Sequence, residues 1–343
     1  MSTVTPGELL LQIRNLNVSY KTRTGLVSAV SDVSLDIYRG EILGLVGESG
    51  CGKSTLGRAL MRMLPRSARI EGQILLHGRE VLGLDNRQLR GLRGRRISMI
   101  FQDPMTSLNP VQRIGDHLSE AVLVHESDGR KADLRQRIGT LVERLGIMRQ
   151  RLSDYPHQLS GGMRQRVMIG LGVVLNPDLI IADEATTSLD VIVAAKLLDQ
   201  LREIREEFGV TIILITHNIA QVAELADRVA VMYAGRIAEV GSVYEVFDGP
   251  QHPYTRGLLR SVPSIKLEDR EELYKMPGEP PNLLSPPAGC RFHPRCPEAM
   301  SICSRIAPEL LPTMPGRLVN CWLYQEHPDK ETPAAGPTPK EAG

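Results

Sequence analysis

The segment that most constrains the fold of this chain is residues 47–55, Gly-Glu-Ser-Gly-Cys-Gly-Lys-Ser-Thr, which contains the complete pattern G-x-x-x-x-G-K-[ST]. A short apolar run, residues 42–46, precedes it, and a segment with helical apolar spacing, residues 53–64, follows it. Glycines at such a turn allow backbone N–H groups and a helix N-terminus to converge on phosphate oxygens. The segment therefore predicts a strand, a phosphate-binding loop and a helix within a parallel-sheet α/β core.

The residues of this loop have distinct expected roles in binding a nucleoside triphosphate. Lys53 is expected to reach the β- and γ-phosphates, and the Ser54 hydroxyl is expected to bind Mg²⁺. The other residues expected to bind the nucleotide are Gly47, Ser49, Gly50, Cys51, Gly52 and Thr55. A chance glycine-rich turn explains the segment poorly, because both the apolar strand and the helix that the motif requires flank it.

A second apolar run, residues 179–182, ends in Asp183 and Glu184. Open α/β sheets bind ligands at the carboxyl ends of their strands, so both carboxylates are expected beside the phosphate loop. Asp183 is the expected Mg²⁺ ligand, directly or through water, and Glu184 is the expected base or positioning group for an attacking water. The two motifs together predict ATP hydrolysis.

A second glycine-rich segment, residues 159–163, has the sequence Leu-Ser-Gly-Gly-Met. Ser160, Gly161 and Gly162 precede an expected helix, and a hydroxyl, free amides and a positive helix end make an anion site. Alone, the segment is explained by an ordinary helix N-cap, but its position between the other two motifs favours the anion site. It contains no lysine, so we expect it to complete the nucleotide site of a second ATPase.

Apolar periodicity predicts the remaining elements. Alternation of apolar and polar residues predicts half-buried antiparallel strands at residues 8–20 and 27–38. Short buried strands are expected at residues 97–101, 179–182, 211–215, 229–233 and 236–240, and helices at residues 114–123, 134–145, 163–175 and 191–208.

These elements divide the chain into a large domain and a small extension. We assign residues 1–260 to a nucleotide-binding domain with an inserted helical subdomain at about residues 103–176. Prolines become dense near Pro250 and four cysteines follow, which indicates a small C-terminal extension at residues 261–327. The tail, residues 328–343, is rich in Pro, Ala, Thr, Lys and Glu and is expected to be disordered.

The charge and hydropathy of the chain indicate where in the cell the protein is expected. The 343 residues carry a net charge of +1, which gives no global attraction to nucleic acid. No apolar run approaches the ~18 residues that a membrane-spanning helix requires, and the N-terminus lacks the pattern of a secretory signal. We therefore expect a cytosolic protein that contacts a membrane only through a partner.

The order of these motifs resembles that of the nucleotide-binding subunits of ATP-binding-cassette (ABC) transporters, over residues 8–261. The resemblance implies that Tyr20 stacks on adenine and that Gln102 senses the γ-phosphate and contributes to the Mg²⁺ site. It also implies that His217 is a catalytic switch histidine and that residues 188–190, Ser-Leu-Asp, form a dimer contact. The expected fold is a phosphate-loop parallel-sheet core with an antiparallel β subdomain.

One subfamily resembles the chain more specifically. Met163 stands where many cassettes have Gln, and Ala185 where many have Pro, and neither position touches the chemistry. The Met163 form and residues 252–259, His-Pro-Tyr-Thr-Arg-Gly-Leu-Leu, are similar to the D-type ATPases of dipeptide, oligopeptide and nickel importers.

The subfamily resemblance implies an ATP-hydrolysing importer subunit that uses ATP and Mg²⁺ and drives uptake of di- or oligopeptides. The implied partners are a second, distinct ABC ATPase in a heterodimer, two transmembrane permeases and an extracytoplasmic solute-binding protein, with no nucleic acid. The subunit would lie peripherally on the cytoplasmic face of the inner membrane. Nickel or another small solute is an alternative cargo, and a non-transport ATPase acting on nucleic acid or ribosomes is a more distant alternative.

The four cysteines of the extension allow three interpretations. Their spacing is C-x5-C-x6-C followed by a long gap: Cys290, Cys296, Cys303 and Cys321. Disulfides are disfavoured in the cytosol, and zinc sites usually open with C-x2-4-C, which is absent here. Four thiolates with wider spacing favour a [4Fe-4S] cluster, as the subfamily resemblance also implies. Zinc and unligated thiols stay open as alternatives.

Overall fold

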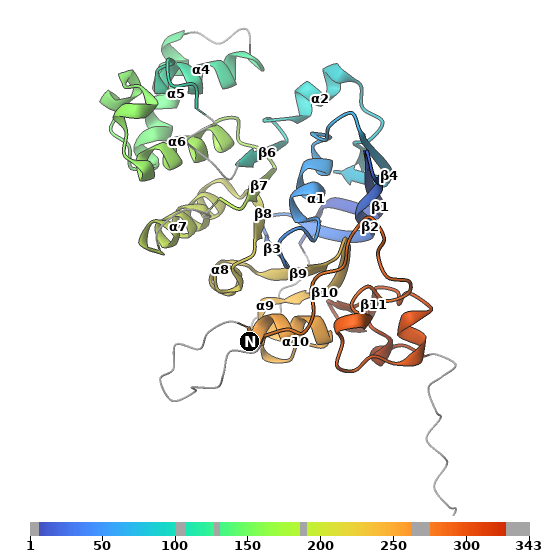
Figure 1. The fold of residues 1–343 in the computed structure, drawn as a ribbon. Coiled ribbons are helices and arrows are strands. Elements are labelled where there is room, and N and C mark those ends of the chain that lie inside the picture. Colours follow the sequence, from blue (N-terminus) through green and yellow to red (C-terminus); the bar gives the residue numbers. More distant parts are fainter. Residues whose placement is uncertain (1–6, 101–107, 127–130, 186–190, 262–274, 327–343) are drawn as a thin grey trace, which may run out of the picture.

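The structure, a computed structural model, describes residues 7–100, 108–126, 131–185, 191–261 and 275–326. Two β-sheets form its framework, with helices packed against the larger one and a group of helices projecting to one side (Figure 1). No helix in these ranges is both long and apolar enough to cross a lipid bilayer.

The smaller sheet is antiparallel, with the strand order β2–β1–β4–β5. Its strands are β1 (Leu9–Thr22), β2 (Gly25–Tyr38), β4 (Ala68–Leu76) and β5 (Arg79–Glu80). The apolar alternation in β1 shifts by one residue at Asn15, whose φ of 47° marks an irregularity in the pairing with β2. The two antiparallel strands predicted from alternation are confirmed, whereas β4 and β5 were not predicted.

The larger sheet has eight strands in the order β11–β12–β10–β9–β3–β8–β7–β6. The strands are β3 (Ile42–Val46), β6 (Ile97–Ile100), β7 (Leu179–Asp183), β8 (Thr211–Thr216), β9 (Arg228–Tyr233), β10 (Arg236–Ser242), β11 (Leu311–Met314) and β12 (Arg317–Val319). The run from β9 to β6 is parallel, and β10, β11 and β12 extend it in antiparallel fashion. The parallel core predicted around the phosphate loop is therefore confirmed.

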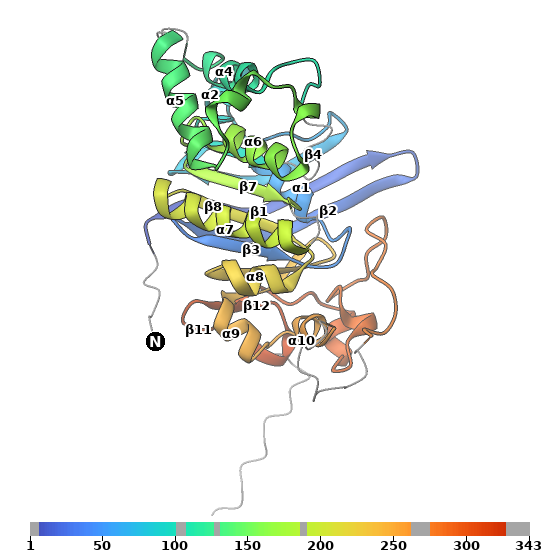
Figure 2. The ribbon, with the colours of Figure 1, turned by 90° about the vertical axis from the view of Figure 1, so that its left-hand side faces the viewer.

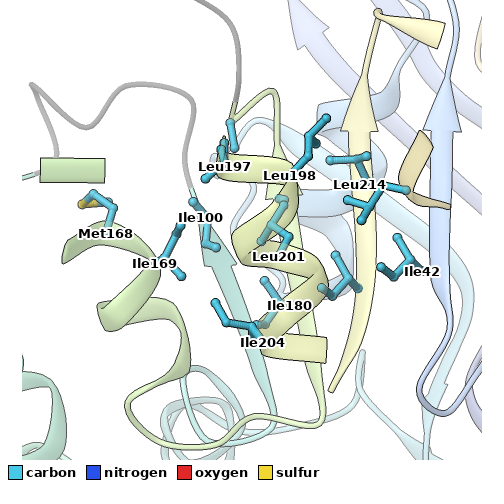
Figure 3. Close-up of a cluster of buried hydrophobic side chains, with 14 of the residues drawn as sticks. Ile42, Ile100, Met168, Ile169, Ile180, Leu197, Leu198, Leu201, Ile204 and Leu214 are labelled. Carbon is cyan, nitrogen blue, oxygen red and sulfur yellow. The ribbon is translucent and has the colours of Figure 1, made fainter. Parts of the chain in front are cut away.

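The parallel strands are buried on both faces, which explains their continuous apolar character. In β7, Ile180 and Ala182 face one apolar cluster, whereas Leu179 and Ile181 face the other. Figure 3 shows the first cluster, where Leu201 of α7 (Val191–Phe208) lies over the sheet. The second cluster lies between the larger sheet, α1 and the antiparallel sheet.

The remaining α-helices have between 6 and 14 residues. They are α1 (Lys53–Leu60), α2 (Asn86–Leu92), α4 (Ile114–Leu123), α5 (Lys131–Arg144), α6 (Gly161–Val173), α8 (Ile219–Leu225), α9 (Val243–Asp248) and α10 (Pro253–Arg260). Short 3-10 helices occur at Arg149–Ser153, Pro156–Gln158, His293–Arg295, Ser301–Ser304 and Trp322–Tyr324.

The helices α4, α5 and α6 group together at one end of the molecule, away from the C-terminal segment (Figures 1 and 2). This arrangement agrees with an inserted helical block, although its exact limits stay a prediction. At the other end, β12 of the predicted extension pairs with β10 of the core sheet. The predicted boundary near residue 260 is therefore crossed by a continuous sheet.

The first helix ends earlier than its apolar spacing predicts, at Leu60 instead of residue 64. Arg62 adopts a left-handed φ of 50°, and two backbone hydrogen bonds end the helix at this point. The Arg62 N–H donates to the Ala59 carbonyl over 2.9 Å, and the Met63 N–H donates to the Arg58 carbonyl over 2.8 Å. These bonds form a Schellman-type end, which periodicity alone does not reveal.

Candidate nucleotide-binding site

The phosphate loop connects β3 to α1, as the motif predicted. Gly47 and Gly52 are required sterically, because a Cβ at either position would lie 2.0 Å from the Met232 carbonyl oxygen or 2.2 Å from the Ala29 carbonyl oxygen. Lys53 is 4% exposed, and its ammonium donates hydrogen bonds to the Gly47 and Glu48 carbonyls at 2.8 and 3.1 Å. The loop therefore encloses a cation at the N-terminus of α1.

Ser54 and Asp183 come together from α1 and the end of β7. The Ser54 hydroxyl donates to Asp183 Oδ1 over 2.7 Å, and Asp183 is buried. Burial raises the pKa of Asp183, and the Ser54 hydrogen bond opposes that rise. A buried carboxylate and a hydroxyl fit Mg²⁺, which prefers oxygen ligands and favours the charged carboxylate.

Glu184 and His217 follow neighbouring parallel strands, β7 and β8. Glu184 adopts a left-handed φ of 48°, which is unusual for a residue with a Cβ, and its N–H donates to the Ile215 carbonyl. His217 Nδ1 lies 3.7 Å from Glu184 Oε1. The imidazole side chain is 53% exposed and the Glu184 side chain 19%, so the pair is accessible to solvent at the carboxyl ends of β7 and β8.

Tyr20 lies in β1, where its hydroxyl is 3.2 Å from the Thr55 hydroxyl of α1. This contact places the predicted adenine-stacking residue beside the first turn of the phosphate-loop helix. Cys51 is buried within the loop, and burial raises the pKa of its thiol. A buried protonated thiol agrees with a structural role for this position.

The second glycine-rich segment begins α6. The Ser160 hydroxyl caps this helix by accepting a hydrogen bond from the Met163 N–H over 3.3 Å. Apart from the chain neighbours and the backbone of the helix itself, no atom lies within 4 Å of a Cβ placed at Gly161 or Gly162, so both positions face open space. In Figure 1, α6 lies with the group of helices to one side of the sheet, whereas α1 lies between the two sheets.

Two groups of predicted residues lie outside the described ranges. They are Gln102, the expected γ-phosphate sensor and Mg²⁺ ligand, and residues 188–190, the expected dimer contact. The expected disordered tail, residues 328–343, also lies outside them.

The structure adds residues that the sequence did not single out as part of the site. The Glu48 N–H donates to the Tyr254 hydroxyl over 2.9 Å, and the Glu48 carboxylate pairs with Arg295. Tyr254 belongs to the segment that carries the subfamily resemblance, which was the only signal for it. No sequence signal pointed to Arg295, because the chain contains many arginines and no motif includes this one.

The prediction of a [4Fe-4S] cluster is wrong. Among the described residues, which include all four cysteines of the extension, no group of three or more His, Cys, Asp or Glu side chains could hold a metal ion. The zinc alternative fails for the same reason. All four cysteines are free. Burial raises the pKa of Cys290, of Cys296 to about 11 and of Cys321 to about 12, so these free thiols are neutral at pH 7.

The geometry thus combines a phosphate loop, a hydroxyl–carboxylate pair and an acidic residue beside a histidine, which together define a phosphate-loop ATPase. A family model described as "ABC transporter" matches residues 30–187. A second model, described as "Oligopeptide/dipeptide transporter, C-terminal region", matches residues 238–303.

Curated relatives extend the similarity to nearly the whole chain. The dipeptide transport ATP-binding protein DppD of Bacillus subtilis is 47% identical over 323 residues, which cover 93% of this chain and 96% of the relative. The oligopeptide transport ATP-binding protein OppD of Salmonella typhimurium is 47% identical over 318 residues, covering 92% and 94%. The names of both relatives describe ATP-binding transport proteins.

Solved structures agree on the fold. CbiO1 of Clostridium perfringens, part of an ABC transporter complex, superposes with a TM-score of 0.62 at 29% identity, covering 71% of this chain and 92% of that one. The dimeric ABC transporter cassette MJ0796 gives a TM-score of 0.60 at 25% identity, covering 68% and 99%. The chain therefore belongs to the ATP-binding subunits of ABC transporters, and it is an ABC-type ATPase.

Proposed function

We propose that this chain is the ATPase subunit of an importer for di- or oligopeptides. The observation that carries the proposal is the joint presence of the phosphate-loop site and a C-terminal segment that matches the oligopeptide/dipeptide transporter model. The relatives DppD and OppD support peptides as the cargo. Nickel or another small solute stays the alternative cargo.

In the proposed mechanism the loop amides and Lys53 bind the nucleotide phosphates, while Tyr20 stacks on adenine. Lys53 now donates to carbonyls of its own loop, so phosphate oxygens would replace those acceptors. The backbone N–H groups of Ser49, Gly50, Cys51 and Thr55 would complete the phosphate contacts, with Gly47 and Gly52 allowing the loop to turn.

Ser54 and Asp183 would hold Mg²⁺, with Gln102 as a further proposed ligand. When bound, Mg²⁺ supplies positive charge that offsets the charge on the β- and γ-phosphates. Glu184 would accept the proton of the attacking water. His217, whose Nδ1 lies 3.7 Å from Glu184 Oε1, would orient the Glu184 carboxylate and contact the γ-phosphate.

Ser160, Gly161 and Gly162 would contact the nucleotide held by a second ATPase. The open space beside both glycines supports this role, because a nucleotide phosphate needs unhindered backbone N–H groups. We propose a heterodimer with a related ATPase, which would bring each phosphate loop opposite the partner's glycine-rich segment. The purified subunit alone would then hydrolyse ATP slowly.

The proposed complex also includes two transmembrane permeases and an extracytoplasmic solute-binding protein. In it the subunit would lie peripherally on the cytoplasmic face of the inner membrane. The test is to co-purify the tagged chain with its membrane partners and to reconstitute them in vesicles. Peptide-stimulated ATPase activity and uptake of a labelled dipeptide are expected. Stimulation by nickel alone would select the alternative cargo, and stimulation by nucleic acid or ribosomes would replace the transport proposal.

A further inference from the structure

We propose that Arg295 of the C-terminal extension is a positioning residue of the nucleotide site. In this proposal it neutralises Glu48, an acidic residue inside the phosphate loop, and fixes its carboxylate away from the bound phosphates. The proposal rests on nucleotide binding by the phosphate loop, as proposed above. It would make the extension a working part of the ATPase site.

The contact has the geometry of a strong, specific ion pair. Arg295 Nη1 lies 2.8 Å from Glu48 Oε2, and Nη2 lies 3.0 Å from Oε1. The guanidinium therefore donates two parallel hydrogen bonds to the carboxylate. The Arg295 side chain is 6% exposed and the Glu48 side chain 22%. Such a sheltered pair is screened by salt less than a surface pair.

Other contacts hold the guanidinium in place. Its Nε donates to the Pro277 carbonyl over 2.9 Å, and Nη1 also donates to the Tyr233 hydroxyl over 3.3 Å. All three guanidinium nitrogens of Arg295 are therefore engaged, and a rotation of the side chain would break several bonds together. The orientation of the fork toward Glu48 is thus set by the extension and by β9.

The backbone of Glu48 is held from the same side. Its N–H donates to the hydroxyl of fully buried Tyr254, whose ring packs against Tyr233 and Phe292 with centroids 4.5 and 5.5 Å away. These rings come from α10, β9 and the extension. Glu48 is therefore tied by its backbone and by its carboxylate to elements far from the loop in sequence.

The charge arrangement explains why such a tie matters for binding. A carboxylate within the phosphate loop repels a triphosphate, and the repulsion is strong where the protein displaces water. Arg295 cancels that charge at the loop. Removing only the arginine should weaken ATP binding by about ten-fold, because two like charges then face each other at short range.

A purely structural brace predicts a different pattern from a charge-compensating residue. If the pair only braces the loop, removing either partner should loosen the loop and weaken binding. If Arg295 compensates charge, Arg295→Gln and Glu48→Gln should change affinity in opposite directions. Glu48→Gln leaves the positive charge of Arg295 near the phosphates without its partner, so we expect this variant to bind ATP about three-fold more tightly.

The experiment measures the dissociation constant of Mg-ATP for the purified full-length chain by calorimetry. The variants are Arg295→Gln, Glu48→Gln and the double variant, with Arg295→Lys as the charge-keeping form and Lys53→Ala as the binding-deficient reference. Arg256→Gln is the matched control, because Arg256 pairs with Glu298 at the same interface without touching the loop. Thermal melting reports folding for every variant.

We expect Arg295→Gln to bind Mg-ATP about ten-fold more weakly than the unaltered chain. The affinities of the double variant and of Arg295→Lys should lie within about three-fold of that of the unaltered chain. If Arg295→Gln does not fold, Glu48→Gln carries the test, because charge compensation predicts tighter binding in this variant and a structural brace predicts weaker binding. Weakened binding by Glu48→Gln, or an unchanged affinity in Arg295→Gln, would overturn the proposal. Absence of ATP binding by the unaltered chain would instead overturn the nucleotide site itself.

Discussion

The core sheet and the C-terminal extension are stabilised by different interactions. In β3, β7 and β8 every residue is buried, and apart from a few strand-end polar residues these strands are apolar. From residue 275 onward, the buried apolar residues among those described are few: Phe292, Ile302, Cys303, Pro308, Val319 and Cys321. The buried set of the extension also includes Arg295, Arg317 and Gln325.

The extension and its junction with the core therefore rely on matched polar groups. Glu239 of β10 accepts hydrogen bonds from the N–H groups of Gln251 and His252, and it pairs with Arg317 of β12 over 2.5 Å. Both side chains of the pair are almost fully buried. The stability of a core held by apolar packing depends little on pH. The stability of a junction held by buried ion pairs depends on pH and falls when one charged partner is removed.

The largest expected effect lies on the core side and concerns chemistry. Replacing Glu184 with Gln should retain ATP binding but lower turnover by roughly 10²–10⁴-fold, the usual contribution of a positioned base. The measurement is steady-state ATPase activity and ATP affinity in the assembled complex. Glu203→Gln is the control, because Glu203 is an exposed carboxylate on α7 away from the site. Unchanged turnover would remove Glu184 from the mechanism.

The second prediction breaks the polar junction. Arg317→Met should lower the free energy of unfolding of the junction by about 3–5 kcal/mol, because it leaves the buried Glu239 charge without its partner. Hydrogen exchange should rise first in β12 and in the segment before α10. Leu201→Ala is the comparison in the apolar core, with an expected loss of about 2–5 kcal/mol spread over the whole sheet. A loss below about 1 kcal/mol in Arg317→Met would contradict this contrast.

The third prediction concerns pH. Burial, with the nearby Arg256 charge as a smaller cause, lowers the pKa of His252 to about 3. The unfolded chain has an ordinary pKa near ~6.5. Between these values only the unfolded state binds the proton, so stability is complete above ~6.5 and falls as the pH drops, by up to about 1.4 kcal/mol per pH unit.

The matched variant for this pH effect is His252→Asn. The His252 Nδ1 caps α10 by accepting from the Tyr254 N–H, and an asparagine oxygen can accept in the same way without titrating. Denaturant unfolding from pH 7 to 4.5 should therefore show a shallower loss in the variant than in the unaltered chain. Equal slopes would show that the acid sensitivity comes from other groups.

The smallest expected effect separates the buried ion pair from the exposed ion pair at the junction between the core and the extension. Arg256 and Glu298 are 2.8 Å apart, but their side chains are 36% and 38% exposed. Arg256→Gln should therefore change the free energy of unfolding by less than about 1 kcal/mol, since water and salt screen such pairs. Thermal melting at two salt concentrations measures the change, and a loss comparable to that of Arg317→Met would erase the distinction between the two pairs.

Local patterns predicted the core well. The helix at 114–123, the helix at 191–208 and the strand at 42–46 have the expected bounds. Continuous apolar runs and helical spacing are local properties, so the sequence carries them directly. The strands β4 and β5 were not predicted; in β4 only Ile74 and Leu76 are buried, which is too few to set an alternating pattern. The end of α1 was predicted at the wrong residue, because no sequence pattern indicates that Arg62 adopts a left-handed conformation.

The chemistry of the site was also visible in the sequence in part. Phosphate loops and strand-end carboxylates need particular residues at short spacing, so Lys53, Ser54, Asp183 and Glu184 could be identified by pattern. The cysteine interpretation failed because wide spacing does not determine whether thiols converge with the geometry and charge that a metal requires. That convergence depends on the path of the chain between them.

The sequence by itself determined the nucleotide-binding class, the order of the core elements and the residues for ATP chemistry, because each depends on neighbours within a few positions. Only the tertiary structure decided that β12 joins the core sheet and that Arg295 reaches Glu48, 247 residues away. Those contacts follow from how distant segments pack, and many arginines in this sequence are equivalent until packing brings one of them to a buried carboxylate.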